Sequence, residues 1–569
     1  MTKDALEQAI LDLRSNKNQW ARVSVADRID ILTRIRTATA DAASEWAALA
    51  CNGKQIPAGS ELEGEEWLSG PYPLILACTA LIRTLRGIQE NSVANELSTR
   101  QVTNDQIAVR VVPGDIWDRL VLGGVTADVW MQPGVSAANL RENIATTYEQ
   151  PDCCRRGSVS LVLGAGNINA IAPLDCFQKL FVEHSVVALK LNPANAYMEP
   201  VLTRCLQPLI DANALRIVTG GSDVGSSPCN HELVDSIHIS GAGQTHDAIV
   251  RGTGEEAARE KKDGTPLNPW PFTSEPGAVC PTIVVPGGWS RRDLKYQAQQ
   301  VATQTLHNSG FNCVATKVLV VPRKWNQCDE FLEALRAEFR NSPGRPLHYP
   351  GSGNRIDEVP GGYPGADEFS VSDDCRRVLT EVDSRDCGLD PEREEIYVPA
   401  LAIKYIDAPD TEKYLRAAIG YCNEELHGTL GANIVIHPST KKLLGSNWNE
   451  MLASLQYGCI AINTWTGLGF LLVTTPWGAY PGHTLDDVQS VIGFVQITYM
   501  LNKVEKTVIE APFRPFTRSF FSTRSASLPK PPWFVAHKRA ANLRKLLSQF
   551  QARRSLLRVP RIFVNALSG

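Results

Sequence analysis

Residues 157–167 read GSVSLVLGAGN, an apolar run that leads into a glycine-rich turn. A short apolar run bounded by turn residues is typical of a buried strand. A helix is predicted next at 173–184, and a second apolar strand follows at 185–192 in SVVALKLN. Strand, turn, helix and strand together form the βαβ unit of a parallel sheet. This stretch therefore predicts an α/β fold with a doubly wound parallel sheet.

The alternation of helices and strands continues on both sides of this unit. The expected helices lie at 4–52 (two helices), 61–98 and 199–213, and the expected strands at 106–112, 215–220, 236–241, 281–287 and 315–322. At 569 residues the chain is too long for one ordinary core, so two or three packed units are expected. Residues 343–392 are polar and rich in glycine and proline, which predicts an insertion or a surface loop.

Composition indicates a soluble cytoplasmic protein. Hydrophobic residues make up 43% of the chain and charged residues 21%, as in ordinary globular proteins. The 14 cysteines show no CxxC pair and no disulfide-like spacing, so neither a metal site nor a disulfide scaffold is predicted. The first residues lack the apolar stretch of a signal peptide, and no uncharged apolar run is long enough to span a bilayer. Reduced thiols in the cytoplasm are the expectation.

The last part of the chain, residues 513–569, differs in charge from the rest and is called the basic extension here. It carries twelve Lys and Arg and no Asp or Glu, so the net charge of -4 leaves about -16 on the preceding residues. Within 532–563, four apolar residues share one helical face: Leu543, Leu546, Leu547 and Phe550. The favoured interpretation is that this helix packs on an acidic surface of its own protein or of a neighbouring subunit. Peripheral contact with an anionic membrane stays open, and nucleic acid is not expected because no binding motif accompanies the charge.

Four polar residues lie at turns or strand ends, but each alone favours an ordinary structural role. Asn167 follows a poor match to a dinucleotide-binding turn, and Lys190 ends a buried strand, where lysines often reach solvent. Glu275 is a loop carboxylate beside proline and glycine. Cys313, in TLHNSGFNCVATKVLVV (305–321), taken alone is most simply core filling.

Their order and spacing, however, resemble those of the aldehyde dehydrogenase superfamily, over about residues 5–511. The turn ISGAG (239–243) resembles the family's FTGS-like turn, and EPGA (275–278) resembles its ELGG motif. NSGFNC (308–313) resembles NxGQxC, EEIYVP (394–399) resembles EEIFGP, and PWGA (476–479) resembles PFGG. The family's asparagine after a buried strand and its strand-ending lysine also align with Asn167 and Lys190 without a gap between them. Each motif is loose, but all occur in the expected order.

The resemblance implies an enzyme that oxidises a small-molecule aldehyde with NAD or NADP and assembles as a homo-oligomer. Cys313 would be the nucleophile, Asn167 would stabilise the oxyanion together with the Cys313 backbone N–H, and Glu275 would activate water. Cofactor contacts would come from three further residues: Lys190 and Glu395 at the two riboses, and Gly241 at the pyrophosphate. Four domains are implied: a cofactor-binding domain at 1–274 with an arm near 129–157, a catalytic domain at 275–475, a return segment with an oligomerisation strand at 476–512, and the basic extension.

Several positions depart from the family pattern and leave alternatives open. The departures are Ala242 for serine, Pro276 for leucine, Val398 for glycine, and Pro193 where NAD-preferring relatives often carry glutamate. Without that glutamate both NAD and NADP remain open. Acyl transfer to CoA and a non-catalytic scaffold are the alternatives to a hydrolytic enzyme. The apolar stretch 464–475 fits a substrate site for a medium or long aliphatic or an aromatic aldehyde, and it fits plain core packing equally well.

Overall fold

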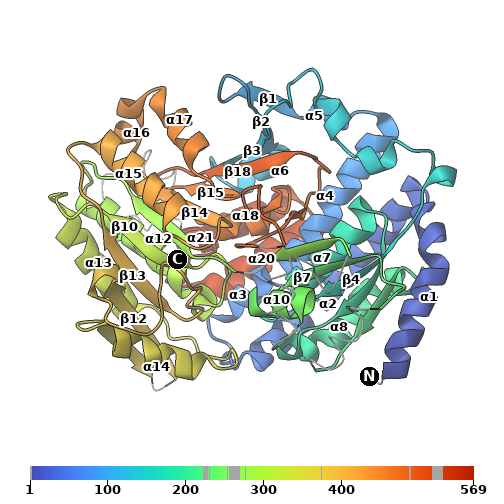
Figure 1. The fold of residues 1–569 in the computed structure, drawn as a ribbon, viewed down its shortest axis with the longest axis horizontal. Coiled ribbons are helices and arrows are strands. Elements are labelled where there is room, and N and C mark those ends of the chain that lie inside the picture. Colours follow the sequence, from blue (N-terminus) through green and yellow to red (C-terminus); the bar gives the residue numbers. More distant parts are fainter. Residues whose placement is uncertain are drawn as a thin grey trace.

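The structure is a computed structural model that describes residues 3–221, 229, 231–241, 243–252, 254, 270–275, 277–372, 374–485, 488–514 and 530–569. Two sheets lie in separate halves of the molecule, each with helices against it (Figure 1). The α/β fold expected from the sequence is confirmed.

The first sheet has five parallel strands built from the βαβ pattern at 157–192. Its order is β6-β5-β4-β7-β8, with bounds Leu215–Val218, Val186–Lys190, Val159–Leu163, Ser236–Ser240 and Phe272–Glu275. Helices α7 (Ile171–Phe177), α8 (Glu199–Asp211) and α10 (Gly243–Arg251) connect the strands. In chain order the strands run 3-2-1-4-5, so the direction of winding reverses between β4 and β7. Doubly wound sheets bind ligands at the carboxyl ends of the strands beside this reversal.

The second sheet has eleven strands and a parallel centre. Its order is β1-β2-β3-β18-β15-β14-β9-β10-β13-β12-β11, with bounds Ser98–Gln101, Ile107–Val112, Thr126–Met131, Val504–Glu510, Cys459–Ile462, Gly431–Val435, Cys280–Val284, Thr316–Val321, Ala400–Tyr405, Cys375–Glu381 and Asp367–Ser372. Strand β18 pairs in parallel with β15 and antiparallel with β3. The helices beside this sheet include α12 (Arg291–Leu306), α13 (Cys328–Asn341), α15 (Thr411–Glu424), α16 (Pro438–Leu444) and α17 (Asn447–Ser454).

The N-terminal helices confirm the expected helical content of the first hundred residues. They are α1 (Lys3–Ala21), α2 (Val25–Gly53), α3 (Glu63–Leu68), α4 (Pro71–Glu90) and α5 (Val93–Glu96). Among the described residues one segment, Glu63–Glu90, is long and apolar enough to cross a membrane, but 83% of its most apolar window is buried inside the protein. That degree of burial is typical of a core helix.

Residues 343–392 were expected to be an insertion or a surface loop, and the loop alternative is wrong. This interval forms helix α14 (Ser352–Gly362) and the antiparallel pair β11 and β12 at the edge of the second sheet. Its polar composition reflects the edge position, because the side chains of β11 are mostly exposed. Glycine and proline lie at its turns and in the last turn of α14, where they end elements that the sequence pattern alone did not reveal.

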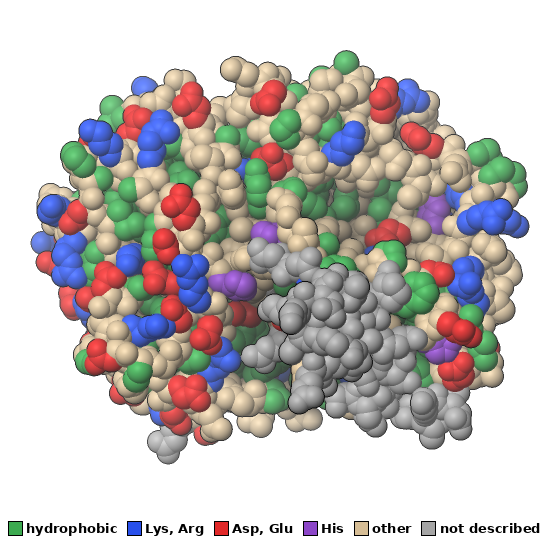
Figure 2. Space-filling model, viewed as in Figure 1, with side chains coloured by type: hydrophobic (Ala, Val, Ile, Leu, Met, Phe, Trp, Pro, Cys, Tyr) green, Lys and Arg blue, Asp and Glu red, His purple; other side chains and the backbone are tan. Residues whose placement is uncertain are grey.

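The described part of the basic extension packs on its own chain. Helix α20 (Ala540–Ala552) lies against α3 and α4 and buries its apolar face, and helix α21 (Val559–Leu567) follows it. Arg554 forms an ion pair with Asp115 at 2.5 Å, and the backbone N–H of Ala541 donates to Glu61. Elsewhere acidic and basic side chains are interspersed over the face in Figure 2. The extension therefore meets acidic groups of its own body, as the favoured interpretation predicted.

Gly64 allows α20 to approach α3 closely. A Cβ at Gly64 would lie 2.7 Å from the carbonyl carbon of Ala540, which is backbone and cannot move aside. We expect Gly64→Ala to lower the free energy of unfolding by about 1–3 kcal/mol through overpacking. In Gly420→Ala on α15 the new methyl meets nothing within 4 Å, so helix propensity should raise stability by up to about 1 kcal/mol. Urea unfolding of both variants checks this, and equal midpoints would contradict the close contact.

Candidate active site

The loop that carries Cys313 joins helix α12 to strand β10 through an unusual turn. Three consecutive residues, 308–310, have φ values of 54°, 53° and 74°, in the left-handed region. A Cβ at Gly310 would lie 2.6 Å from the carbonyl oxygen of Val398, so the turn needs glycine there. The Asn312 side chain donates to the His307 carbonyl at 2.8 Å and ties the turn together. This local packing fixes the position of Cys313.

Cys313 meets Glu275 at the junction between the two sheets. Glu275 is the last residue of β8 rather than a loop residue, and its side chain is buried. The Cys313 thiol donates to Glu275 Oε1, with 3.8 Å between the sulfur and the oxygen. Trp477 Nε1 donates to the same oxygen. A thiol from one half of the molecule and a carboxylate from the other are therefore in direct contact.

Burial shifts the pKa values of both groups. Desolvation, and then the negative charge of Asp175, raise the pKa of Glu275 to about 8, against the opposing hydrogen bonds from Trp477 and Cys313. Cys313 is partly exposed, but the surrounding protein and then the charges of Glu275 and Glu395 raise the pKa of its thiol well above the ordinary value. The thiol is therefore protonated near neutral pH, and Glu275, which is hydrogen-bonded to it, becomes a base as the pH rises through its own pKa of about 8.

Asn167 lies beside the Cys313 loop. Its Nδ2 donates to the carbonyl oxygen of Phe311 at 2.9 Å. The hydroxyl of Tyr397 donates to the same carbonyl at 3.2 Å. Tyr397 was not singled out from the sequence, although it is the aromatic residue of EEIYVP, and its φ of 48° is rare for so large a residue. Two hydrogen-bond donors therefore lie within two residues of Cys313.

Glu395 lies near enough to Cys313 for its charge to act on the thiol. A Cβ at Gly277 would lie 1.8 Å from Glu395 Oε2, so only glycine leaves room for the carboxylate. Burial raises the pKa of Glu395 to about 7, against the opposing charges of Lys317 and Arg355. Within the described structure Glu395 Oε1 is buried without a hydrogen-bond partner. A buried carboxylate oxygen of this kind normally has a partner, so it can accept from a bound ligand.

Lys190 and Gly241 lie with Asn167 at the carboxyl edge of the first sheet. Lys190 is the last residue of β5, and Gly241 follows β7, with its N–H donating to the Glu275 carbonyl at 3.2 Å. Among the described residues a Cβ at Gly241 would meet nothing closer than 3.8 Å, so their packing does not require glycine there. Two family departures noted from the sequence, Ala242 and Pro276, lie outside the described residues.

A buried polar network beneath Glu275 was also missed by sequence reasoning. Asp175 Oδ2 accepts from the Ser240 hydroxyl at 2.9 Å and lies 3.3 Å from His238 Nε2. His238 Nδ1 bonds Thr273 Oγ1 at 2.9 Å across the neighbouring strands β7 and β8. No local motif marks these residues, because they come together only when α7, β7 and β8 pack.

Comparison with known proteins points to one family. A model described as the aldehyde dehydrogenase family matches residues 184–348, a range that contains four of the six predicted site residues: Lys190, Gly241, Glu275 and Cys313. This match supports membership of the aldehyde dehydrogenase superfamily. Comparison with curated proteins finds no significant match.

Solved structures share the aldehyde dehydrogenase fold at low sequence identity. An NAD-dependent aldehyde dehydrogenase from Sinorhizobium meliloti is 14% identical, with a TM-score of 0.60 over 89% of this chain and 86% of that chain. An NADP-dependent glyceraldehyde-3-phosphate dehydrogenase from Bacillus halodurans, complexed with NADP, is 16% identical, with a TM-score of 0.59 over 89% and 91%. Glyceraldehyde-3-phosphate dehydrogenase GapN from Methanocaldococcus jannaschii is 13% identical, with a TM-score of 0.56 over 90% and 94%. At these identities the likeness concerns the fold.

Proposed function

We propose that the protein oxidises an aldehyde to a carboxylic acid, with NAD or NADP as the hydride acceptor. The observation that carries this proposal is the hydrogen bond between the Cys313 thiol and the buried Glu275 carboxylate. A thiol held against a base is a nucleophile that can be activated in place. The Asn167 amide at the same loop supports the proposal, because a carbonyl attacked by sulfur needs a donor for its oxygen.

In the first step Cys313 Sγ bonds to the aldehyde carbon while its proton passes to Glu275. The carbonyl oxygen takes up the electron pair, and a hydrogen bond from Asn167 Nδ2 or from the Cys313 backbone N–H stabilises it. One such donor is worth about 3 kcal/mol in the transition state. The product of this step is a thiohemiacetal on Cys313.

The residues at the sheet edge fit a dinucleotide. Lys190 and Glu395 would hold the two riboses, and Gly241 would leave room for the pyrophosphate. The unpartnered Glu395 Oε1 and the open space at Gly241 support this assignment. When bound, the nicotinamide supplies the acceptor for the hydride that leaves the substrate carbon, so that a thioester remains on Cys313. Pro193 carries no charge that would repel a 2′-phosphate, so both dinucleotides fit.

Glu275 first releases the proton that it took from the thiol to solvent. In the last step it accepts a proton from water, whose oxygen attacks the thioester; the acid leaves, and the proton passes from Glu275 to the Cys313 sulfur. A carboxylate with a pKa of about 8 is a stronger base than an ordinary glutamate, and it is mostly ionised for this task above about pH 8. The position of Glu275 at the sulfur favours water over CoA as the acyl acceptor.

An absorbance screen tests the activity. Purified protein would be mixed with a panel of aldehydes and NAD or NADP, with and without CoA, and formation of reduced nicotinamide would be followed. Turnover without CoA is expected. Turnover that needs CoA would replace hydrolysis by acyl transfer, and no turnover in any combination would contradict an oxidoreductase.

Asp175→Asn should move the pH dependence of aldehyde oxidation towards lower pH. The charge of Asp175 raises the pKa of Glu275, so removal of this charge lets Glu275 ionise at lower pH. The rising limb of the pH–rate profile, in which the rate increases as Glu275 ionises, should therefore move to lower pH as well. Because burial is the larger cause, the limb should stay above the range of a free glutamate. Ser240→Ala removes a hydrogen bond to Asp175 but no charge and should leave the limb in place. Identical limbs in both variants would contradict this electrostatic link.

The outer surface of the basic extension supports a second proposal, peripheral contact with an anionic membrane. We define this surface by five exposed apolar residues, Leu556, Leu557, Phe563, Val564 and Leu567, flanked by Arg553 and Arg561. Each basic group near an anionic membrane surface contributes about 1 kcal/mol to the free energy of membrane binding. Flotation with phosphatidylserine vesicles should therefore fall in Leu557→Glu, while Leu443→Glu on α16, which is equally exposed, should float like the wild type. Equal flotation of both variants would remove the membrane contact and leave the protein in the cytoplasm.

The homo-oligomer remains a proposal. Strand β18 is paired on both sides within its own chain, so pairing between subunits would have to use another sheet edge. Light scattering during size-exclusion chromatography measures the mass of the assembly and so gives the oligomeric state.

A further inference from the structure

A buried cluster of four charged residues lies beside the turn 308–310 and is not used by the proposed mechanism. Its members are Lys54 directly after α2, Glu65 and Glu66 of α3, and Arg345 between α13 and α14, and none is more than 4% exposed. Lys54 pairs with Glu66 at 2.9 Å, and Arg345 pairs with both glutamates. The two positive and two negative charges balance, so the cluster has no net charge to attract a ligand ion.

Glu65 joins this cluster to the turn that precedes Cys313. Its Oε2 accepts a hydrogen bond from the backbone N–H of Asn308 at 3.0 Å, and the same oxygen is ion-paired with Arg345. Burial acts to raise the pKa of Glu65, but the charge of Arg345 and the hydrogen bond from Asn308 help to lower it to about 2, so Glu65 is ionised and can only accept. Asn308 begins the run of left-handed φ values, a conformation that the surrounding structure has to hold.

The other members of the cluster hold the same turn from two further segments. The Ser309 hydroxyl donates to the Arg345 carbonyl at 3.3 Å, and Lys54 Nζ donates to Asn308 Oδ1 at 3.4 Å. A buried ion pair adds little stability compared with apolar residues of similar volume. Support of the turn therefore accounts for the cluster better than overall stability does.

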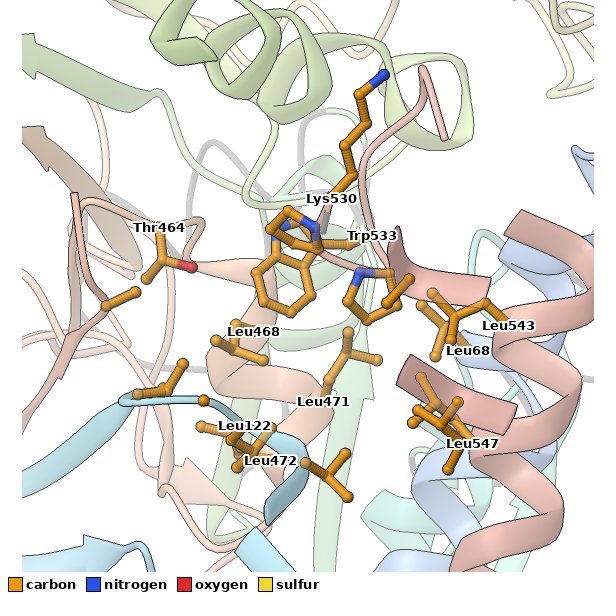
Figure 3. Close-up of a pocket in the computed structure, with 18 of the residues that line it drawn as sticks. Leu68, Leu122, Thr464, Leu468, Leu471, Leu472, Lys530, Trp533, Leu543 and Leu547 are labelled. Atoms are coloured by element: carbon orange, nitrogen blue, oxygen red, sulfur yellow. The ribbon is translucent and has the colours of Figure 1, made fainter. Parts of the chain in front are cut away.

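The basic extension covers α3 where it carries Glu65. A Cβ at Gly64 would lie 2.7 Å from Cδ of Arg544 on α20, so the two helices touch at this point. Leu68 at the end of α3 and Leu543 of α20 line one apolar cavity (Figure 3). The extension thus packs on the helix that carries the two glutamates of the cluster.

We propose that Glu65 is a positioning residue, which holds the turn 308–310 in place and thereby sets Cys313 against Glu275. Cys313 follows the turn by three residues, so the 3.8 Å between its sulfur and Glu275 Oε1 depends on where the turn lies. A displacement of about 1 Å at a reacting group can lower a rate about 10²-fold. The inference rests on the proposed function, in which Cys313 is the nucleophile.

Glu65→Leu and Glu65→Gln test this role, because both remove the charge but only glutamine keeps an oxygen for the Asn308 N–H. Glu65→Leu should lower kcat for aldehyde oxidation at least about tenfold. The KM values should change by less than about threefold, since Glu65 is not among the proposed substrate or cofactor contacts. Glu65→Gln should keep kcat within about threefold of the wild type. The matched control is Glu505→Leu on β18, which removes a buried carboxylate that accepts from Gln106 at 2.6 Å and should keep kcat in the same range.

Hydrogen–deuterium exchange of the turn 308–310, followed by mass spectrometry, tests the hydrogen bond without any aldehyde. Exchange should be at least about tenfold faster in Glu65→Leu and close to the wild type in Glu65→Gln. If Glu65→Leu does not fold, the double variant Glu65→Met with Arg345→Met takes its place with the same expectations. It removes both charges, which is often neutral for stability.

The positioning role is overturned if folded Glu65→Leu, or the double variant in its place, keeps the kcat or the exchange rate of the wild type. It is also overturned if Glu65→Gln loses as much kcat as Glu65→Leu, since the charge rather than the hydrogen bond would then matter. If the wild type oxidises no aldehyde while exchange follows the expectation, the proposed function fails and support of the turn by Glu65 stands.

Discussion

Cys313→Ala should abolish aldehyde-dependent formation of reduced nicotinamide, with a fall of more than about 10³-fold in kcat. The methyl group cannot form the bond to the aldehyde carbon, and no other described cysteine hydrogen-bonds to Glu275. Steady-state absorbance with a saturating aldehyde measures the loss.

The matched control is Cys422→Ala. Cys422 is a buried cysteine of α15 in the core beside the second sheet. Its removal should lower stability but leave turnover close to that of the wild type. A Cys313→Ala enzyme that retains wild-type turnover would remove the nucleophile from the mechanism.

Glu275→Gln should separate the two halves of the reaction. Loss of the negative charge lowers the pKa of the Cys313 thiol, so the sulfur can lose its proton to solvent instead of to residue 275 and still attack, whereas water loses its base. We expect one rapid equivalent of reduced nicotinamide followed by a steady rate about 10²–10⁴-fold below the wild type. Stopped-flow absorbance resolves the burst from the steady phase.

Trp477→Phe is the control for the hydrogen bond that Glu275 accepts. It removes the N–H donor but keeps the carboxylate, so it should change the rate without a burst. A Glu275→Gln enzyme whose steady rate is undiminished would show that another group activates water.

The strands and helices of the first sheet follow from local pattern, because buried strands and glycine turns are marked in neighbouring residues. The site could be predicted as a set of residues but not as a geometry. The 3.8 Å between the atoms of Cys313 and Glu275 depends on where two sheets meet, and no local signal encodes that distance. Asp175 and Tyr397 were missed for the same reason, since each acquires its role from partners far away in the chain.

The C-terminal half of the chain shows where local reasoning fails. The interval 343–392 was predicted as an insertion or a surface loop because an exposed edge strand has a polar composition similar to that of a loop. The amphipathic pattern of the extension identified the buried face of α20 but not its partner. That partner is set by the missing side chain of Gly64, which lets the backbone of Ala540 approach α3. The fit between α20 and α3 appears only once the two helices, far apart in the sequence, lie side by side in the folded chain.

The central claim is that Cys313 carries the oxidised acyl group during turnover. The most direct measurement is mass spectrometry of Glu275→Gln after mixing with an aldehyde and NAD or NADP. The expected result is an adduct with the mass of the acyl group on the peptide that contains Cys313, in an amount equal to the reduced nicotinamide formed in the burst. Reduced nicotinamide without an adduct, or an adduct on any other residue, would contradict it.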